Sequence, residues 1–333
     1  MSPAPDGQVR WGILGAARIA RQSFLPGLRE AGGGRAALVA SRDIKRAGVF
    51  ARDEGVDRAV EGYEAAVGSP EIDAVYVALP NSHHARWTQK ALEAGKAVLC
   101  EKPLCVSPAE TEAVLQTAAA TGSPLWESFV FPFQAQHLRL LELLASQVVG
   151  EVRELVAPFH FNLSRLVDIR LSAELGGGAL ADVGCYPVRL AQEVLSTHDP
   201  SAGDVVGFST GIGAVDTETV AVVDYGGQRL LLSCGFERSF DVFTRVIGTE
   251  GQIHLTNPYH PTPRDVIVLR RGGTETIEHP TSDAWSFAAA IRHIHAVVRG
   301  EESPRHLAAE SSLRSARTLQ AIVQACRPTG TPR

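Results

Sequence analysis

The feature that most constrains this fold is the alternation of short apolar runs and amphipathic segments through the first third of the chain. Helical periodicity over Ala85–Glu93 and Glu110–Ala119 separates some of these runs. Such alternation predicts βαβ units around a parallel sheet, and near-continuous apolar strands indicate burial on both faces. The predicted strands are Val9–Leu14, Ala36–Ala40, Ala74–Leu79, Ala97–Cys100 and Pro124–Trp126.

After about Glu127 the pattern changes to runs rich in Val, Phe and Thr, which predict an antiparallel sheet. These runs are Thr219–Asp224, Arg229–Cys234 and Thr244–Ile247. Tyr225–Gly227 looks like part of a hairpin turn, because glycine supplies positive φ. Helical periodicity returns over Ser286–Ala325, and the polar Pro/Gly tail beyond it is expected to fray.

The length of 333 residues predicts two domains, which we place at residues 1–126 and 127–333. The predicted fold class is therefore α/β. A parallel-sheet domain comes first, and an α+β domain with a large, mostly antiparallel open sheet follows it.

The composition excludes several classes of protein. The net charge of −5 comes without basic blocks, which argues against a nucleic-acid binder and favours a small-molecule partner. The segment Met1–Gln8 is short and polar, and no apolar stretch is long enough to span a bilayer, so we expect no membrane partner and a cytoplasmic location. Five scattered cysteines without a C-x-x-C pair predict neither a metal site nor a disulfide scaffold.

A nucleotide-binding motif follows the first predicted strand. The segment Gly15–Ala20 occupies the place of a G-x-G-x-x-G/A fingerprint, with Ala17 at the second glycine position and Arg18 and Ile19 after it. The glycines of that motif let the backbone approach a pyrophosphate at a helix N-terminus. The alternative is a simple turn between strand and helix.

The end of the second strand favours one cofactor over another. An NAD site usually has a carboxylate there, whereas this chain has Ser41 and Arg42. A hydroxyl and a guanidinium suit the 2′-phosphate of NADP(H), which a carboxylate would repel. The alternative is a solvated Arg42 with Asp43 on the ribose.

Two further strand ends carry polar residues to the same edge of the sheet. Leu79 ends the third predicted strand, and Pro80 and Asn81 follow it at the edge where open α/β folds bind ligands. Glu101 and Lys102 follow the fourth predicted strand. A partly desolvated lysine donates hydrogen bonds to a substrate oxygen and favours a developing alkoxide, which hydride transfer to a carbonyl requires.

A third cluster follows the triglycine Gly176–Gly178. Asp182 and Tyr186 are four residues apart, so in a helix they share one face. A phenol near an ammonium ion can exchange a substrate proton, while Asp182 orients the substrate or the lysine. Pro187 predicts a kink or a restart of the helix. On spacing alone, a helix turn packed on a sheet is the alternative.

Together these segments resemble the glucose–fructose oxidoreductase, inositol dehydrogenase and rhizopine-catabolism (Gfo/Idh/MocA) family over nearly the whole chain. The resemblance rests on the E-K-P of Glu101–Pro103, the P-N-x-x-H of Pro80–His84 and the G-G-G-A-L-x-D-V-G-C-Y-P run of Gly176–Pro187. It implies a Rossmann domain followed by an open α/β domain. It also implies a catalytic group of Lys102, Asp182 and Tyr186, with Glu101 and the loop that includes His84 lining the nicotinamide pocket.

Tyr186 stands at a position where many members have His. In this respect the chain is similar to the branch of D-xylose dehydrogenase, dihydrodiol dehydrogenase and NDP-3-ketosugar reductases. Trp126–Gln136 is similar to an aromatic segment of that branch but departs from it at Pro132 and Gln134. Arg170 is interpreted as a grip for a hydroxyl or a diphosphate, with a surface salt bridge as the alternative.

The aromatic side chains of that segment alternate at strand spacing and predict one sheet face. They are Phe129, Phe131 and Phe133. We expect most of them in the core, with Phe129 also a candidate for stacking on a sugar.

The predicted function is that of an NADP(H)-dependent oxidoreductase acting on a CH–OH or C=O carbon of an aldose or related polyol. The alternative within the same class is an NDP-3-ketosugar reductase of deoxysugar biosynthesis. A third hypothesis, a nucleotide-sensing regulator without turnover, is disfavoured by the complete set of Lys102, Asp182 and Tyr186. The resemblance further implies a homodimer or homotetramer formed through the open face of the second sheet.

Overall fold

The computed structural model describes residues 7–164, 168–195, 199–200, 202–281 and 283–328. The chain divides into two compact units. The first consists of Met1–Cys105, Ala109–Val130 and Asp283–Ala309, and the second of Val106–Pro108, Phe131–Ser282 and Glu310–Arg333.

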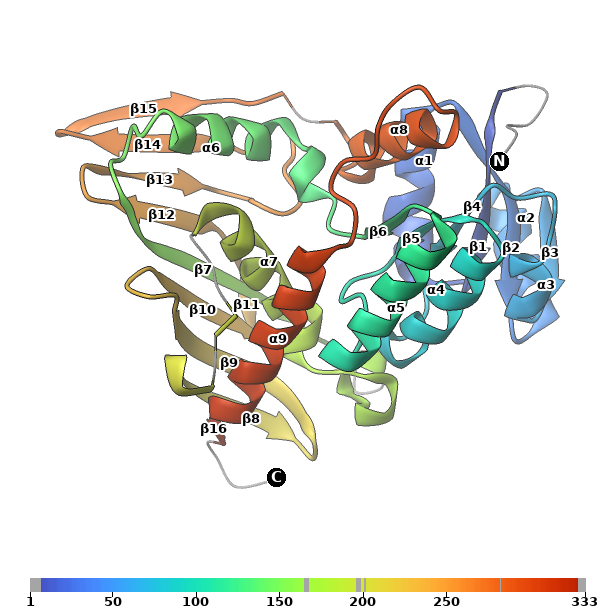
Figure 1. Cartoon of the computed structure of the whole chain (residues 1–333), viewed down its shortest axis with the longest axis horizontal. Helices are drawn as coiled ribbons and strands as arrows, with labels where there is room; N and C mark the ends of the chain where they lie inside the picture. Colours follow the sequence, from blue (N-terminus) through green and yellow to red (C-terminus); the bar gives the residue numbers. More distant parts are fainter. Residues whose placement is uncertain (1–6, 165–167, 196–198, 201, 282, 329–333) are drawn as a thin grey trace. The chain divides into compact units, whose positions relative to one another are not determined.

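A six-stranded parallel sheet forms the centre of the first unit, in the order β3-β2-β1-β4-β5-β6 (Figure 1). This is the order of a Rossmann fold. The strands are β1 (Val9–Leu14), β2 (Gly34–Ser41), β3 (Arg58–Glu61), β4 (Ala74–Val77), β5 (Ala97–Cys100) and β6 (Leu125–Glu127). The five predicted strands are confirmed, and β3 was missed because its residues are exposed or half-buried and make no apolar run.

Helices cover both faces of this sheet. They are α1 (Leu25–Ala31), α2 (Ile44–Glu54), α3 (Tyr63–Val67), α4 (His84–Glu93), α5 (Pro108–Thr121) and α8 (Phe287–Val298). Side chains of successive β1 residues point to opposite faces, so Leu14 joins one core with Trp87 of α4 and Val114 of α5. Trp11, on the other face, packs edge-on against Phe24 with ring centroids 5.1 Å apart.

The segment Asp283–Ala309 returns to the first unit late in the chain, a step that the predicted boundary at 126/127 did not include. Its helix α8 packs on α1. Trp11 Nε1 donates a 2.8 Å hydrogen bond to His295 Nε2, and His295 Nδ1 lies 2.8 Å from Gly32 O. The predicted helical run Ser286–Ala325 is thus two helices. The first, α8, completes the core of the first unit, and the second helix belongs to the second unit.

A ten-stranded mixed sheet forms the second unit, in the order β15-β14-β13-β12-β7-β10-β9-β8-β16 with β11 also paired to β7. Neighbours are antiparallel except β7–β10 and β8–β16. The strands are β7 (Val152–Asn162), β8 (Val205–Ile212), β9 (Val215–Asp224), β10 (Arg229–Gly235), β11 (Glu237–Val242), β12 (Thr244–Gly248), β13 (Gly251–Leu255), β14 (Ile267–Arg271), β15 (Thr274–Glu278) and β16 (Arg327–Pro328). The hairpin turn is confirmed by a 2.7 Å hydrogen bond from Tyr225 N to Gln228 O.

One face of this sheet is covered by helices, and part of the other is open. The helices are α6 (Ala135–Ala145), α7 (Cys185–Val194) and α9 (Glu310–Ala325), and α7 and α9 pack side by side (Figure 1). Burial alternates along β8 and β9, as expected for a sheet covered on one side. Val206, Phe208 and Phe240 are 71%, 50% and 70% exposed. Within the described residues no helix is long and apolar enough to cross a membrane.

Two predictions fall differently in the structure. Phe131–Phe133 forms a 3₁₀ turn, closed by a 3.0 Å hydrogen bond from Gln134 N to Phe131 O, so the predicted sheet face for Phe129, Phe131 and Phe133 is wrong. Strand β6 already ends at Glu127, and Pro132 has no N–H to donate to a ladder. The predicted fraying of the tail is wrong for Arg327–Pro328, which pairs with β8 as a strand, and residues 329–333 lie outside the described residues.

Candidate functional site

The strand order of the first unit reverses between β1 and β4, and open α/β folds bind ligands at such a point. Gly15 follows β1 there with φ of +104°. A Cβ atom on Gly15 would lie 2.5 Å from the carbonyl oxygen of Ala78, which follows β4. Only glycine therefore fits this close approach of two backbones. Ala17 is half-buried and Arg18 is exposed where the chain turns into helix.

The end of β2 presents a hydroxyl and a guanidinium, and a capped helix follows. Ser41 is buried, and its Oγ accepts a 3.3 Å hydrogen bond from Asp43 N. Asp43 Oδ1 caps α2 by accepting from Lys45 N at 2.8 Å and from Arg46 N at 3.4 Å. The capping role accounts for Asp43 without a ribose contact. Arg42 is exposed beside it.

His84 links two of the strand ends. Its ring is 0% exposed, with Nδ1 2.8 Å from Pro103 O and Nε2 2.9 Å from Leu79 O. Burial lowers the pKa of His84, and the nearby charge of Lys102 acts in the same direction. A neutral imidazole has one N–H, so it donates to one of the two carbonyls at a time. His84 thus braces the end of β4 against the E-K-P turn.

Lys102 follows the end of β5, and its side chain is half-buried. The carboxylate of Glu101 lies beside it and is contacted from two sides. Tyr76 Oη donates a 2.5 Å hydrogen bond to Glu101 Oε1, and Lys102 N lies 3.3 Å from Glu101 Oε2. Burial raises the pKa of Glu101, while the charge of Lys102 lowers it. Glu127 Oε1 accepts a 2.9 Å hydrogen bond from Leu104 N, so the E-K-P turn is fixed on both sides of Lys102.

In the second unit, the triglycine allows a tight passage into a helix. A Cβ atom on Gly177 would clash with Arg170 O, and one on Gly178, where φ is +126°, would clash with Asp216 Oδ1. Asp216 Oδ2 accepts a 2.8 Å hydrogen bond from Leu180 N. This carboxylate of β9 therefore holds the start of the helical segment, although its position far along the chain gave no sequence signal.

Asp182 lies in that segment, a π-helical turn over Leu180–Gly184, and forms an ion pair. Its Oδ2 lies 2.5 Å from Arg170 Nε, and Arg170 Nη1 lies 3.2 Å from Asp168 Oδ1. Arg170 is only partly exposed, so this is a half-buried pair rather than a surface one. Arg170 thus forms a salt bridge, as in the alternative interpretation, but the pair is half-buried and not at the surface as that interpretation had it. The predicted restart before Pro187 is also present, because α7 begins at Cys185.

Tyr186 is 5% exposed and lies among aromatic rings. The ring centroids of Phe159 and Tyr259 lie 5.4 Å and 5.0 Å from its own. Its hydroxyl is 3.0 Å from Nε2 of His260, in the loop between β13 and β14. Sequence reasoning missed His260, whose only local signal is a histidine inside a Pro-rich turn.

The remaining predicted residues lie as follows. Phe129 is 4% exposed, which confirms its place in the core. Pro80 and Asn81 lead into the 3₁₀ turn before α4, and Ile19 is 37% exposed. Lys102 belongs to the first unit, whereas Asp182 and Tyr186 belong to the second.

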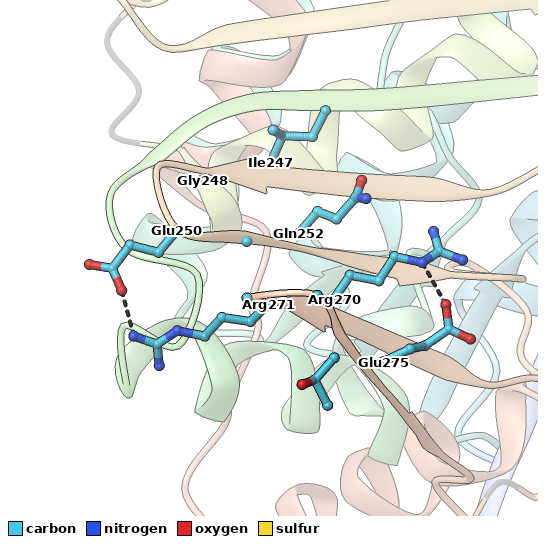
Figure 2. A pocket seen from close by; sticks show the side chains of 11 residues that line it. Ile247, Gly248, Glu250, Gln252, Arg270, Arg271 and Glu275 are labelled. Atoms are coloured by element: carbon cyan, nitrogen blue, oxygen red, sulfur yellow. Dashed lines mark hydrogen bonds and ion pairs between the residues drawn. The ribbon is translucent and has the colours of Figure 1, made fainter.

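A hollow at the tips of two hairpins is lined by charged side chains (Figure 2). Arg270 Nε lies 2.6 Å from Glu275 Oε2, and Arg271 Nη2 lies 2.5 Å from Glu250 Oε2. Each guanidinium therefore has a carboxylate partner at the surface. None of the predicted site residues lines this hollow, and we assign it no ligand.

Comparison with known proteins identifies the family. The model of an oxidoreductase family with an NAD-binding Rossmann fold, GFO/IDH/MocA, matches residues 9–129, and that of the GFO/IDH/MocA C-terminal domain matches residues 137–254. This chain belongs to the GFO/IDH/MocA oxidoreductases. The predicted family, fold class and enzyme class are thereby confirmed.

Several members of the family are similar over nearly their full length. A dTDP-3,4-didehydro-2,6-dideoxy-alpha-D-glucose 3-reductase of Streptomyces violaceoruber is 34% identical over 95% of both chains. A D-xylose 1-dehydrogenase (NADP(+)) of Haloferax volcanii is 34% identical over 94% of this chain and 96% of its own. The crystal structure of KijD10, a 3-ketoreductase from Actinomadura kijaniata in complex with NADP and TDP-benzene, has a TM-score of 0.86 and 32% identity, covering 96% and 98% of the two chains.

Proposed function

We propose that this chain is an NADP(H)-dependent oxidoreductase that transfers a hydride between the nicotinamide and a CH–OH or C=O carbon of a sugar or sugar-like polyol. One observation of the first unit carries the proposal. The glycine cradle after β1 and the fixed Lys102 after β5 lie at the same carboxyl edge of one sheet, with only β4 between their strands. We infer that the dinucleotide binds at this edge near the ammonium group of Lys102.

The residues of this edge fit a dinucleotide. Gly15 lets the chain turn closely past the end of β4, and helical N–H groups follow it, which suits a pyrophosphate. Ser41 and Arg42 at the end of β2 suit the 2′-phosphate that distinguishes NADP(H). The dinucleotide supplies or accepts the hydride when it is bound.

The protein's own groups handle the proton and the substrate oxygen. We assign Lys102 the role of donating a hydrogen bond to that oxygen, which stabilises negative charge developing on it. Glu101, which accepts a hydrogen bond from Tyr76, holds the backbone of Lys102 in position. We assign Tyr186 the exchange of the hydroxyl proton, with Asp182, paired to Arg170, orienting the substrate.

Two substrate classes follow from the relatives, because a dTDP-ketosugar reductase and a D-xylose dehydrogenase are equally similar to this chain. We place free aldoses and polyols first, because Arg170, the candidate grip for a diphosphate, is already bound by two carboxylates. A dTDP-linked 3-ketosugar is the second candidate, favoured by the likeness to KijD10.

The test is NADP⁺ reduction and NADPH oxidation across a panel of aldoses, inososes and dTDP-ketosugars. We expect turnover with one class, and a loss of roughly 10² or more in kcat for Lys102→Ala with that substrate. Lys96→Ala is a matched control, because Lys96 Nζ binds the carbonyls of Ser69 and Ile72 at 2.8 Å. No turnover across the panel, or a Lys102→Ala variant as active as the wild type, would refute the proposal.

We further propose that the open face of the second sheet is covered by another copy of the chain, giving a homodimer or homotetramer. Val206 and Phe208 of β8 lie exposed, as does Val220 of β9, which is paired with Phe208. Exposed apolar side chains gathered on one sheet face are typical of an interface.

A further inference from the structure

Tyr186 lies against a histidine that no motif identifies. The 3.0 Å contact joins Tyr186 Oη to His260 Nε2, and the two rings meet edge to face at 5.5 Å. At this distance the contact is an ordinary hydrogen bond. Its hydrogen is covalently bonded either to Tyr186 Oη or to His260 Nε2. The state of the histidine therefore decides where the tyrosine hydrogen points.

The loop that presents His260 is held firmly. Asn257 Nδ2 donates a 2.6 Å hydrogen bond to His260 O, and His260 N lies 3.3 Å from Asn257 Oδ1. Asp265 Oδ2 accepts from the N–H and the hydroxyl of Thr262, both at 2.7 Å. Side-chain hydrogen bonds thus fix the loop at both ends of the histidine, as a positioned donor requires.

The neighbouring Tyr259 anchors the same loop in the aromatic cluster. Its ring is 0% exposed and stacks on Phe159 at 5.6 Å with an interplanar angle of 8°. Because Phe159 and Tyr259 both also pack on Tyr186, the phenol and the imidazole are held by one set of contacts. The titratable groups facing the pair from this loop are Tyr259 and, through Asn257, Asp265.

We propose that His260 is a positioning residue for the proton transfer by Tyr186, an inference that rests on the proposed oxidoreductase function. With a proton on Nε2, His260 donates to the phenolic oxygen, and the hydroxyl hydrogen of Tyr186 is then directed away from the imidazole and toward the substrate oxygen. When the Oη–H bond breaks and the proton moves to that oxygen, the hydrogen bond from Nε2 stabilises the phenolate that remains.

A double-mutant cycle tests this role. We expect His260→Phe, which keeps a ring but has no donor, to lower kcat about tenfold, the size of one hydrogen bond. His260→Gln, whose amide also donates, should retain more activity. In a Tyr186→Phe background neither change should lower kcat further. Equal losses in both backgrounds, or none in either, would overturn the proposal.

A titration without substrate separates this inference from the proposed function. The chain has five tyrosines, and subtracting the ultraviolet titration of Tyr186→Phe from that of the wild type isolates Tyr186. We expect His260→Phe to move the ionisation of Tyr186 to higher pH, because the donor to the phenolate is lost. His254→Phe, on β13, is the control and should not move it. An unmoved titration with His260→Phe refutes the inference even if the enzyme turns over sugars.

Discussion

His295 makes the stability of the first unit depend on pH. Trp11 Nε1 donates to His295 Nε2, so this nitrogen must be unprotonated, and Nδ1 carries the only N–H and donates it to Gly32 O. A protonated ring would turn Nε2 into a donor facing a donor. Burial accordingly lowers the pKa of His295 from 6.5 to about 4.

The linkage between protonation and folding gives the direction and the size of this change in the free energy of unfolding. Above pH 6.5 the histidine is neutral in both the folded and the unfolded chain, so it adds no pH dependence. As the pH falls, the unfolded chain takes up a proton that the folded chain does not. The free energy of unfolding therefore decreases, by about 3 kcal/mol when the pH reaches the folded pKa.

Urea unfolding followed by tryptophan fluorescence measures this loss. All four tryptophans, at positions 11, 87, 126 and 285, belong to the first unit, so the signal reports that unit alone. We expect the unfolding free energy of His295→Gln to fall about 3 kcal/mol less than that of the wild type between pH 6.5 and 4. His279→Gln, at an exposed position after β15, should follow the wild type. Parallel pH profiles for wild type and His295→Gln would contradict the reasoning.

Two further predictions concern the cofactor and the assembly. Replacing Arg42 with Asp should raise KM for NADP(H) about tenfold or more without a comparable change for NAD(H), because a charge-assisted hydrogen bond to the 2′-phosphate is replaced by repulsion. Steady-state kinetics with both cofactors measure this difference. An unchanged KM for NADP(H) would show that Arg42 does not bind the cofactor. Replacing Phe208 with Asp should convert the oligomer into a monomer, because assembly would bury a charge between the two open sheet faces. Light scattering measures the oligomeric state, and a monomeric wild type would contradict the proposed assembly.

The sequence predicted the first sheet well because its strands are buried on both faces. Strands β1 and β5 contain almost only apolar residues and were placed at their observed ends. Strand β3 is short and solvent-facing, so neither length nor periodicity distinguished it from a loop. In the second unit, strands such as β14 and β15 carry charged residues paired across the hairpin, as with Arg270 and Glu275, which hide the alternation.

The site residues divide in the same way. Gly15, Ser41 and Lys102 could be grouped from the sequence because parallel topology brings the ends of successive strands to one edge. No comparable rule relates the helix containing Tyr186 to the loop containing His260, which is more than 70 residues further along the chain. Only the pairing of distant strands brings such residues together.

The return of Asp283–Ala309 to the first unit also affects the order in which the chain matures. During synthesis the strands of the Rossmann sheet leave the ribosome long before His295, the partner of Trp11, which lies 284 residues further along the chain. The cluster of Trp11 and Phe24 therefore lacks its contacts with Phe287 and His295 until α8 has been made. The first unit is thus completed by a segment that is made after most of the second unit.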